Sequence, residues 1–306
     1  MTALFIGFGS IARKHAGSLM NIYPDAVMYA LRSKRDAPAI PGVTSIYEWS
    51  DLPLHIDFAV IATPTFLHTT ALKILLGKKI PVMLEKPIAD SLDGLDMISE
   101  QIIAENAFVY IACNLRFLPV LQFLKKFIGE NNPVINEVNI YAGSFLPGWR
   151  PGIDFRKNYS ANAEMGGGVH LDLFHELDYT HWIFGLPRQS QVLKRNVSSL
   201  NINAMDCALY LWEYKNFTAT IKLNYYRPVA KRNIEIVFED DIWDADILTG
   251  EIKNSRGEII FSDTQYKIAD TYFDQMKYFT DCINDNRKPV LNTFDKSLET
   301  LKLCLS

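Results

Sequence analysis

The stretch Ala3-Leu-Phe-Ile-Gly-Phe-Gly-Ser-Ile-Ala12 decides how the first part of this 306-residue chain is expected to fold. Its apolar run ends in glycine, as in a strand that is buried on both faces, and a helical pattern begins directly after it. The glycines and Ala12 have the spacing G-x-G-x-x-A, which lets a backbone turn approach a pyrophosphate at the N-terminus of a helix. A structural glycine turn is the alternative, and the position between strand and helix favours the dinucleotide site. The expected phosphate-binding residues are Gly7, Gly9, Ser10 and Ile11.

The composition is that of an ordinary globular protein. The chain is 48% hydrophobic and 12% aromatic, and its length is enough for two domains with sizeable cores. A net charge of -4 argues against a nucleic-acid partner, because phosphate backbones require a concentrated positive surface. The four cysteines are scattered singly, and we expect reduced thiols in the cytoplasm. We expect neither a signal peptide nor a membrane partner, because no apolar window reaches the roughly 18 residues that a span needs.

The end of the second expected strand bears on the choice of cofactor. The strand is expected at 26–31, and NAD-preferring sites have an acidic residue near its end, about 20 residues after the glycines. Here the sequence continues as Arg32-Ser33-Lys34-Arg35, with three cations and no acid. Arginine and lysine suit the 2′-phosphate of NADP, so the sequence favours NADP over NAD, with Arg32 and Ser33 as contacts. A solvated basic loop is the alternative.

Three further apolar runs, at 57–63, 80–84 and 107–113, predict more strands of the same parallel sheet. The residues after each run lie at the carboxyl edge of the sheet, where open α/β sheets bind ligands. Lys86, which a following proline fixes at a strand end, could contact a substrate oxygen and stabilise negative charge there. An exposed surface lysine is the alternative. The cofactor-binding residues expected along this edge are Thr63, Pro64, Thr65, His68, Glu85, Lys86 and Asn114.

A run of three glycines, 166–168, opens into an expected helix that carries Asp172 and His175. Glycine permits positive φ and a close approach to a ligand, and the start of a helix offers N–H groups that are not bonded within it. Residues three apart lie on one face of a helix, where a carboxylate can orient a histidine that acts as a general base. A buried capping carboxylate beside a core histidine is the alternative.

These motifs follow one another along nearly the whole chain, and together they resemble the glucose-fructose oxidoreductase/inositol dehydrogenase family, usually written Gfo/Idh/MocA. The motifs that carry the resemblance are the N-terminal G-x-G-x-x-A, Ala62-Thr-Pro-Thr with His68, Glu85-Lys86-Pro87, Asn114 with Arg116-Phe117, and the glycine-led helix with Asp172 and His175. Such a set of separate motifs is specific for the family and says little about the substrate.

The resemblance implies a Rossmann domain followed by an α+β domain with a large open, mainly antiparallel sheet. By resemblance, Lys86 would lie beside the nicotinamide and the substrate hydroxyl, and Asp172 matches the helix aspartate of the family. The family's histidine usually follows that aspartate by four residues, where this chain has Glu176. His175, three residues on, stays on the same helix face and is our candidate acid/base, although Lys86 is an open alternative as proton acceptor.

The sequence pattern changes near residue 116 from alternating helices and strands to successive strands. We therefore expect a dinucleotide-binding domain over 1–115 and a substrate-binding and oligomerisation domain over 116–306. The segment 217–225 alternates apolar and polar residues, as in a sheet with one buried face. Members of the family often pack the other face against a second subunit, which implies a homodimer or homotetramer through the C-terminal sheet.

The loop 148–160 carries arginines and aromatic residues just before the glycine run. Arginine can bind carboxylate or phosphate, and aromatic rings can stack on a sugar or a base. The loop also resembles that of family members found with bacterial surface-sugar genes, for which amino-sugar or nucleotide-sugar substrates are suspected. A packed loop with outward arginines is the alternative. The expected substrate-binding residues are Arg116, Trp149, Arg150, Arg156, Tyr159, Asp172 and His175.

Taken together, these features predict an NAD(P)-dependent oxidoreductase that transfers hydride between the nicotinamide and a CH–OH or carbonyl carbon of a sugar, an amino sugar or a nucleotide sugar. The preferred cofactor is NADP, and no metal is expected because no set of His and Cys residues has ligand spacing. Two alternatives stay open. One is a non-catalytic regulator that senses a dinucleotide, and the other is a redox-neutral epimerase or eliminase with tightly bound NAD.

Overall fold

The computed structural model describes all 306 residues, and the chain divides into two compact units. The first unit comprises 1–114 and 269–301, and the second comprises 115–268 and 302–306. The expected division placed 269–301 in the second domain, and the structure corrects this part of it.

The first unit is built on a six-stranded parallel sheet with the strand order β3-β2-β1-β4-β5-β6. This is the order of a doubly wound Rossmann sheet. The chain adds parallel strands outward from β1 on one side and then outward from β4 on the other. Strands β4 and β6 are fully buried, as the uninterrupted apolar runs predict. The strands are β1 (Thr2–Ile6), β2 (Val27–Leu31), β3 (Val43–Ile46), β4 (Phe58–Ile61), β5 (Val82–Glu85) and β6 (Val109–Ala112).

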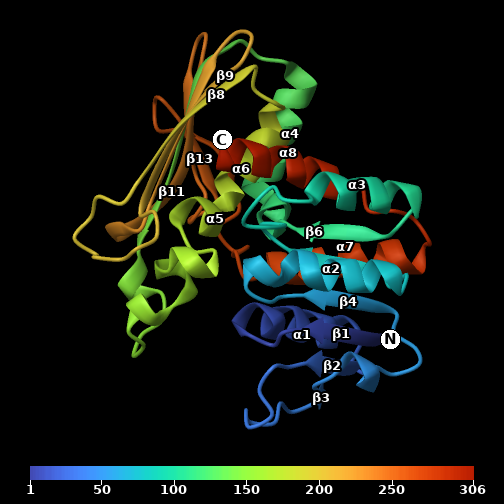
Figure 1. Ribbon diagram of the computed structural model, residues 1–306. Helices are drawn as coiled ribbons and strands as arrows, with labels where there is room; N and C mark the ends of the chain where they lie inside the picture. Colours follow the sequence, from blue (N-terminus) through green and yellow to red (C-terminus); the bar gives the residue numbers. More distant parts are fainter. The chain divides into compact units, whose positions relative to one another are not determined.

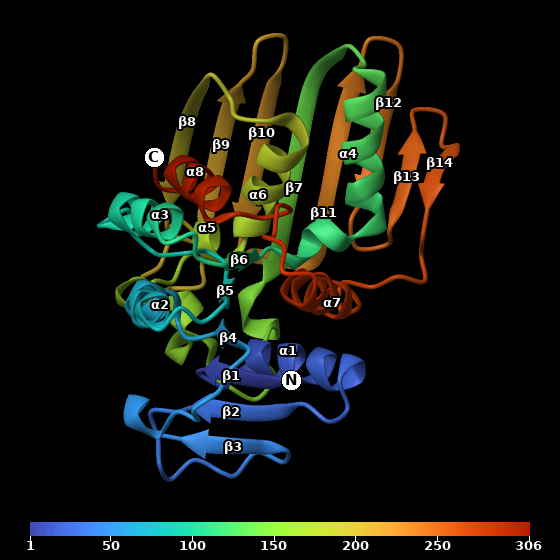
Figure 2. The same ribbon diagram turned by 90° about the vertical axis from the view of Figure 1, so that its right-hand side faces the viewer.

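Helices cover both faces of this sheet (Figure 2). On one face lie α2 (His68–Gly77) and α3 (Leu95–Ala104), and on the other lie α1 (Ser10–Ile22) and α7 (Thr271–Asn284). The segment 269–301 joins this unit because α7 completes its core: the ring of Phe279 packs edge-on against that of Phe58, with centroids 5.2 Å apart. A helical period predicts that α7 exists, but it does not say which sheet the helix covers. The last helix, α8 (Phe294–Leu305), follows α7.

The second unit is built on an eight-stranded sheet with the order β14-β13-β12-β11-β7-β10-β9-β8. Its neighbours pair antiparallel except β7 and β10, which pair parallel. In β10, Ala219, Ile221 and Leu223 are buried, as the predicted alternation requires. The strands are β7 (Ile135–Phe145), β8 (Gln189–Arg195), β9 (Cys207–Glu213), β10 (Thr218–Asn224), β11 (Tyr226–Phe238), β12 (Ile242–Asp246), β13 (Glu251–Asn254) and β14 (Ile259–Ser262).

One face of the large sheet is covered by helices. Figure 2 shows α4 (Pro119–Asn131) and α6 (Phe174–Phe184) in front of its strands, and α5 (Val169–Asp172) precedes α6. Figure 1 shows no α-helix on the other face. The two units together confirm the predicted combination of a Rossmann sheet with a large, mainly antiparallel sheet.

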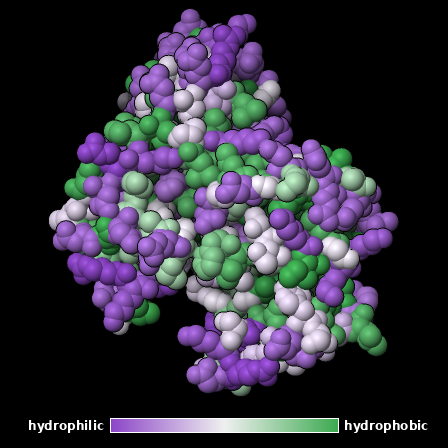
Figure 3. Space-filling view, viewed as in Figure 1, coloured by the Kyte–Doolittle hydropathy of each residue, from purple (hydrophilic) through white to green (hydrophobic).

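No helix of the chain is both long and apolar enough to cross a membrane. The face drawn in Figure 3 carries many hydrophilic residues, and hydrophobic residues gather near the middle of the view. None of the four cysteines forms a disulfide.

Candidate functional site

The turn after β1 has the geometry of a phosphate-binding loop. Gly7 has a φ of +79°, and a Cβ added there would lie 3.1 Å from Cγ2 of Thr63 and 3.2 Å from the carbonyl oxygen of Ala62. Glycine is therefore required at this position by both the backbone angle and the neighbouring strand end. The hydroxyl oxygen of Thr63 is buried beside this turn and has no hydrogen-bond partner. A ligand that reaches the turn would find an unused hydroxyl group there.

Gly9 immediately precedes α1, and its surroundings are open. A Cβ added at Gly9 would meet no atom within 4 Å, so glycine is not required here by the protein itself. Ser10, the first residue of α1, is exposed, Ile11 is partly exposed, and the first turn of the helix contains no acidic residue. Open space at the N-terminus of a 13-residue helix suits an anionic group, because the first N–H groups point into it. These residues fit the pyrophosphate of a dinucleotide.

The basic segment lies at the end of β2, as expected. Nη1 of Arg32 lies 2.9 Å from the carbonyl oxygen of Pro38 and 3.1 Å from Oγ of Ser45. Ser33 is exposed, and the only ion pair recorded for this segment joins Arg35 to Glu48 over 3.1 Å. Neither Arg32 nor Ser33 is itself acidic, and neither is joined to a carboxylate by an ion pair.

Two residues expected to contact the cofactor, His68 and Asn114, are buried and make hydrogen-bond contacts within the protein. His68 is 1% exposed, and its Nδ1 and Nε2 each lie 2.9 Å from a carbonyl oxygen, of Pro87 and Thr63 respectively. Asn114 is 4% exposed and donates from Nδ2 to Oγ1 of Thr271 over 2.6 Å. Their side chains therefore hold the loops of the carboxyl edge together, and their contact with the cofactor stays a prediction. Thr65 is also buried, whereas Pro64 is exposed.

Lys86 lies at the carboxyl edge of the sheet, directly after β5, and is partly exposed. The preceding residue, Glu85, contacts His15 of α1, with Oε1 and Nε2 2.5 Å apart. Sequence reasoning missed His15, because its partner is 70 residues away along the chain.

In the second unit, Asp172 and His175 share one property that their neighbours lack. Between Gly166 and His181 only Asp172 and His175 keep partial access to solvent, and all the remaining residues are buried. The expected continuous helix is wrong, because α5 ends at Asp172, and Leu173, with φ of -93° and ψ of 35°, separates it from α6. The segment thus presents one carboxylate and one imidazole from an otherwise buried surface.

Asp172 is oriented by a buried tyrosine that sequence reasoning treated only as a strand residue. The hydroxyl of Tyr225 donates to Oδ2 of Asp172 over 2.5 Å, and Tyr225 is fully buried. Burial and the neighbouring carboxylate raise the pKa of Tyr225 well above its usual range, so this hydroxyl stays a donor. The same two causes raise the pKa of Tyr159. Asp172 is therefore surrounded by phenol groups that remain protonated.

The glycine run makes room for the protein's own backbone. A Cβ added at Gly167 would lie 2.0 Å from the carbonyl oxygen of Tyr159 and 2.6 Å from that of Asn162, and Gly168 has a φ of +143°. We expected a ligand to approach the backbone closely at these glycines. In the structure it is the backbone of 159–162 that packs closely against Gly167. This contact brings the loop that carries Tyr159 against the segment of Asp172.

Glu176, at the position where the family usually has histidine, is not available for chemistry. Its side chain is fully buried and paired with Arg232, with Oε1 and Nε 2.7 Å apart. His175 keeps the access to solvent that Glu176 lacks. The geometry therefore favours His175 over Glu176 as the acid/base.

Arg116 was expected to bind substrate, but the structure gives it another role. It is 3% exposed, and its Nε and Nη2 donate to the two carboxylate oxygens of Asp178 over 2.9 and 2.7 Å. A bidentate pair of this kind, buried on both sides, ties the start of the second unit to α6. We therefore leave Arg116 out of the site.

The loop before the glycine run contributes side chains of two kinds. Trp149 donates to Oγ of Ser144 over 2.9 Å and packs edge-on against Tyr225, with centroids 5.4 Å apart, which places it near Asp172's partner. Arg150 donates to Oδ1 of Asn158 over 2.8 Å. Arg156, in contrast, has a side chain that is 52% exposed. A cavity of about 220 Å³ lies beside Trp149 and is lined by Ala142, Gly143, Ser144, Trp149, Leu173, Ala230, Lys231, Arg232 and Leu248.

No group of three or more His, Cys, Asp or Glu side chains is arranged to hold a metal ion.

Known proteins are similar to this chain in both sequence and fold. Residues 1–112 match the family model described as "Oxidoreductase family, NAD-binding Rossmann fold". An uncharacterized oxidoreductase of Synechocystis sp. is 30% identical over 146 residues, which cover 47% of this chain and 38% of that protein. Myo-inositol 2-dehydrogenase of Thermotoga maritima is 21% identical over 318 residues, which cover 97% of this chain and 92% of that protein.

The fold is also that of a solved dehydrogenase. The WlbA dehydrogenase from Bordetella pertussis, solved in complex with NADH and UDP-GlcNAcA, superimposes with a TM-score of 0.80 over 98% of this chain and 92% of that chain, at 17% identity. The family model covers the sheet that holds the glycine turn, and the wider likeness extends through both units. Residues 1–112 therefore match the Gfo/Idh/MocA oxidoreductase family, and the whole chain is similar to inositol 2-dehydrogenases in sequence and fold.

Proposed function

We propose that this oxidoreductase acts on a CH–OH or carbonyl carbon of a sugar-like substrate, with a nicotinamide dinucleotide as its redox partner. The observation that carries the proposal is the pair Asp172 and His175, the only accessible side chains in an otherwise buried segment. A carboxylate and an imidazole kept accessible in this way are suited to bind a hydroxyl group and to move its proton.

The residues of the first unit fit a dinucleotide. The N–H groups at the start of α1 would bind the pyrophosphate in the open space at Gly9, and the buried hydroxyl of Thr63 would gain a partner there. When bound, the dinucleotide supplies the hydride acceptor or donor.

We infer a preference for NADP over NAD from the end of β2. Arg32 and Ser33 would contact a 2′-phosphate, and the absence of a carboxylate at these two residues removes the group that accepts ribose hydroxyls in NAD-preferring sites. Arg32→Ala should therefore weaken NADPH binding by at least about tenfold, or 1.4 kcal/mol, and change NADH binding much less.

Each candidate catalytic side chain has a role that its chemistry allows. Lys86, a cation at a strand end, would stabilise negative charge on the substrate oxygen. His175 would accept or return the hydroxyl proton, and Asp172, fixed by Tyr225, would bind a substrate hydroxyl or orient His175. Lys86 is the other candidate for the proton acceptor.

The relatives and the loop support the proposed class of substrate. Myo-inositol 2-dehydrogenase acts on a polyol ring, and the WlbA structure contains a nucleotide sugar. Trp149 and Tyr159 could stack on a ring, and Arg150 could bind an anionic group, so we propose a sugar, a cyclitol, an amino sugar or a nucleotide sugar.

The proposal is tested by titrating the purified protein with NADPH and NADH, followed by addition of polyols and nucleotide sugars. We expect micromolar binding of at least one cofactor and a change in the absorbance of the reduced nicotinamide with at least one substrate. A protein that binds the cofactor but gives no change with any substrate would be a sensor. A protein that binds neither would have a purely structural glycine turn.

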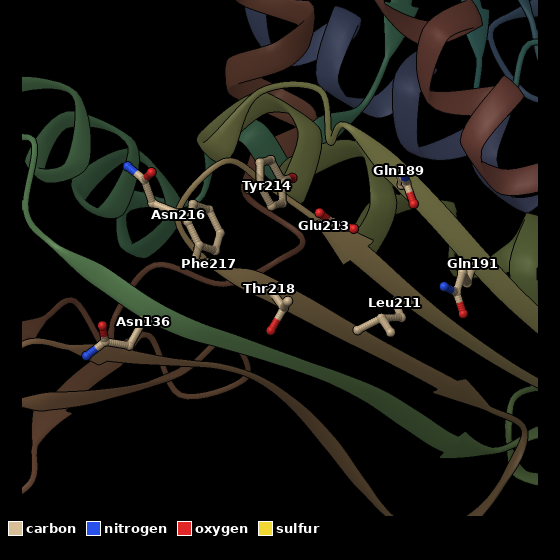
Figure 4. A pocket seen from close by; sticks show the side chains of 9 residues that line it. All are labelled: Asn136, Gln189, Gln191, Leu211, Glu213, Tyr214, Asn216, Phe217 and Thr218. Atoms are coloured by element: carbon tan, nitrogen blue, oxygen red, sulfur yellow. The ribbon is translucent and has the colours of Figure 1, made fainter.

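We also propose a homodimer or homotetramer through the open face of the large sheet. On this face Leu193 and Leu209 pair across β8 and β9, and their exposed fractions are 53% and 40%. A groove of about 430 Å³ lies on the same face (Figure 4), lined by Asn136, Gln189, Gln191, Leu211, Glu213, Tyr214, Asn216, Phe217 and Thr218. It contains none of the candidate catalytic residues. Leu209→Glu should lower the molecular mass in solution to that of the monomer, while an unchanged mass would exclude this face.

The cysteines, which form no disulfide, suit the cytoplasm that we propose as the compartment.

A further inference from the structure

Lys86 stands at a point where the sheet no longer fixes the backbone. The ladder between β4 and β5 ends at Leu84, and the ladder between β5 and β6 ends at Glu85. Lys86 is thus the first residue beyond both ladders. A side chain whose function requires a defined position needs other contacts to hold its backbone, because a loop position alone is less precise than a strand position.

A buried histidine holds the residue before Lys86. His15 projects from α1, is fully buried, and has its Nε2 2.5 Å from Oε1 of Glu85. The ring of His15 also packs against the ring of Tyr272, with centroids 5.5 Å apart and planes at 68°. Its position is therefore fixed by packing and does not depend on Glu85.

A second buried histidine holds the residue after Lys86. His68, the first residue of α2, is 1% exposed, and its Nδ1 lies 2.9 Å from the carbonyl oxygen of Pro87. Its Nε2 lies 2.9 Å from the carbonyl oxygen of Thr63, at the end of the neighbouring strand. Burial lowers the pKa of His68, so near pH 7 its neutral ring donates through one nitrogen only. Donation from Nδ1 to the carbonyl oxygen of Pro87 is the tautomer that holds the residue after Lys86.

We propose that His15 and His68 are positioning residues for Lys86, which they fix by holding Glu85 and Pro87 on its two sides. The inference rests on the role proposed above for Lys86. His15 belongs to the helix that begins at the phosphate-binding turn, and His68 contacts the loop that carries Thr63. The two histidines therefore connect the backbone at Lys86 with both parts of the dinucleotide site in this unit.

Hydrogen–deuterium exchange of the cofactor-free, full-length protein tests the proposal without a substrate. In His15→Leu, which removes the donor to Glu85, the amides of 86–90 should exchange at least about tenfold faster, while those of β1 keep the wild-type rate. His15→Gln retains a side-chain N–H and should restore the wild-type rate. His55→Gln is the matched control, because the side chain of His55 is 77% exposed.

Two amide substitutions at His68 separate its two contacts. In His68→Asn the amide nitrogen takes the place of Nδ1 and can still donate to Pro87, whereas in His68→Gln it takes the place of Nε2 and can donate only to Thr63. We expect 86–90 to exchange at the wild-type rate in the Asn variant and faster in the Gln variant. A merely structural role would affect both variants alike. These two variants also provide the test where His15→Leu does not fold.

Wild-type exchange at 86–90 in both His15→Leu and His68→Gln would overturn the proposal, and so would faster exchange spread over the whole sheet. Titration of the wild type with NADPH and NADH separates this outcome from failure of the proposed function. If no dinucleotide binds, the function fails whatever the exchange shows. If a dinucleotide binds and exchange is unchanged, only the positioning role fails. With a turned-over substrate, His15→Leu should lower kcat while the Kd for the dinucleotide stays within about twofold.

Discussion

The substitution Gly9→Ala should weaken dinucleotide binding and leave the stability of the fold almost unchanged. The backbone there has φ of -81° and ψ of -164°, an extended conformation that any residue adopts, and the added Cβ would meet no protein atom within 4 Å. Alanine is a poorer residue than glycine before a helix by roughly 0.5–1 kcal/mol, and it gains about 0.4–1 kcal/mol by restricting the unfolded chain. The free energy of unfolding of Gly9→Ala should therefore stay within about 1 kcal/mol of the wild type.

The same methyl group occupies the space that we assign to the pyrophosphate. If it displaces one or two charged hydrogen bonds from the N–H groups of α1, at about 1.5 kcal/mol each, binding weakens by roughly 10- to 100-fold. Fluorescence titration with NADPH and NADH measures the affinity, and urea unfolding measures the stability.

Gly17→Ala in the same helix is the matched control. A Cβ at Gly17 also meets no atom within 4 Å, and alanine in a helix interior adds about 1 kcal/mol of stability. Its affinity for the dinucleotide should equal that of the wild type. A Gly9→Ala protein that is folded and binds both dinucleotides as tightly as the Gly17→Ala control would refute the phosphate-binding role of this turn.

Three further predictions concern the second unit. Tyr225→Phe removes the donor to Asp172, a bond to a charged group of about 1.5–3 kcal/mol, so kcat/KM should fall at least about tenfold in steady-state assays, and an unchanged kcat/KM would contradict the orienting role. Burial lowers the pKa of His170 to about 4 from 6.5, so the unfolded state binds its proton first and stability is lost as pH falls from 6.5 toward 4. Urea unfolding of wild type should lose about 3 kcal/mol more than His170→Gln over this range, and equal losses would argue against the shift. Gly167→Ala forces a Cβ to within 2.0 Å of a backbone carbonyl, which should cost at least about 3 kcal/mol in the free energy of unfolding, and a variant of wild-type stability would exclude the observed contact.

The features predicted correctly from the sequence depend on residues that are close together along the chain. The buried parallel strands follow from short apolar runs, the turn at Gly7 from the spacing of its glycines, and the alternation in β10 from period-two patterning. For these, local physics suffices, because the neighbours that matter lie within one strand–turn–helix unit.

What the sequence could not give depends on partners far away along the chain. Arg116 is a reasonable anion-binding residue by sequence, but Nε and Nη2 of its guanidinium pair with Asp178, which lies 62 residues later. In the same way His68 has the chemistry of a ligand contact but is enclosed by two carbonyl groups, one of them 19 residues away. A continuous helix through Asp172 fits the periodicity, and only tertiary packing decides that it breaks at Leu173. The pairing of Tyr225 with Asp172 has no local signal at all.

If Lys86 serves the chemistry of an oxidoreductase, its removal should lower turnover without removing the dinucleotide. Turnover of Lys86→Ala is compared with that of the wild type at saturating cofactor and substrate, alongside the Kd for the dinucleotide in both proteins. We predict that turnover falls by at least about 100-fold, or 2.7 kcal/mol, while the Kd changes by no more than severalfold. Turnover at the wild-type rate in Lys86→Ala would show that Lys86 takes no part in the chemistry.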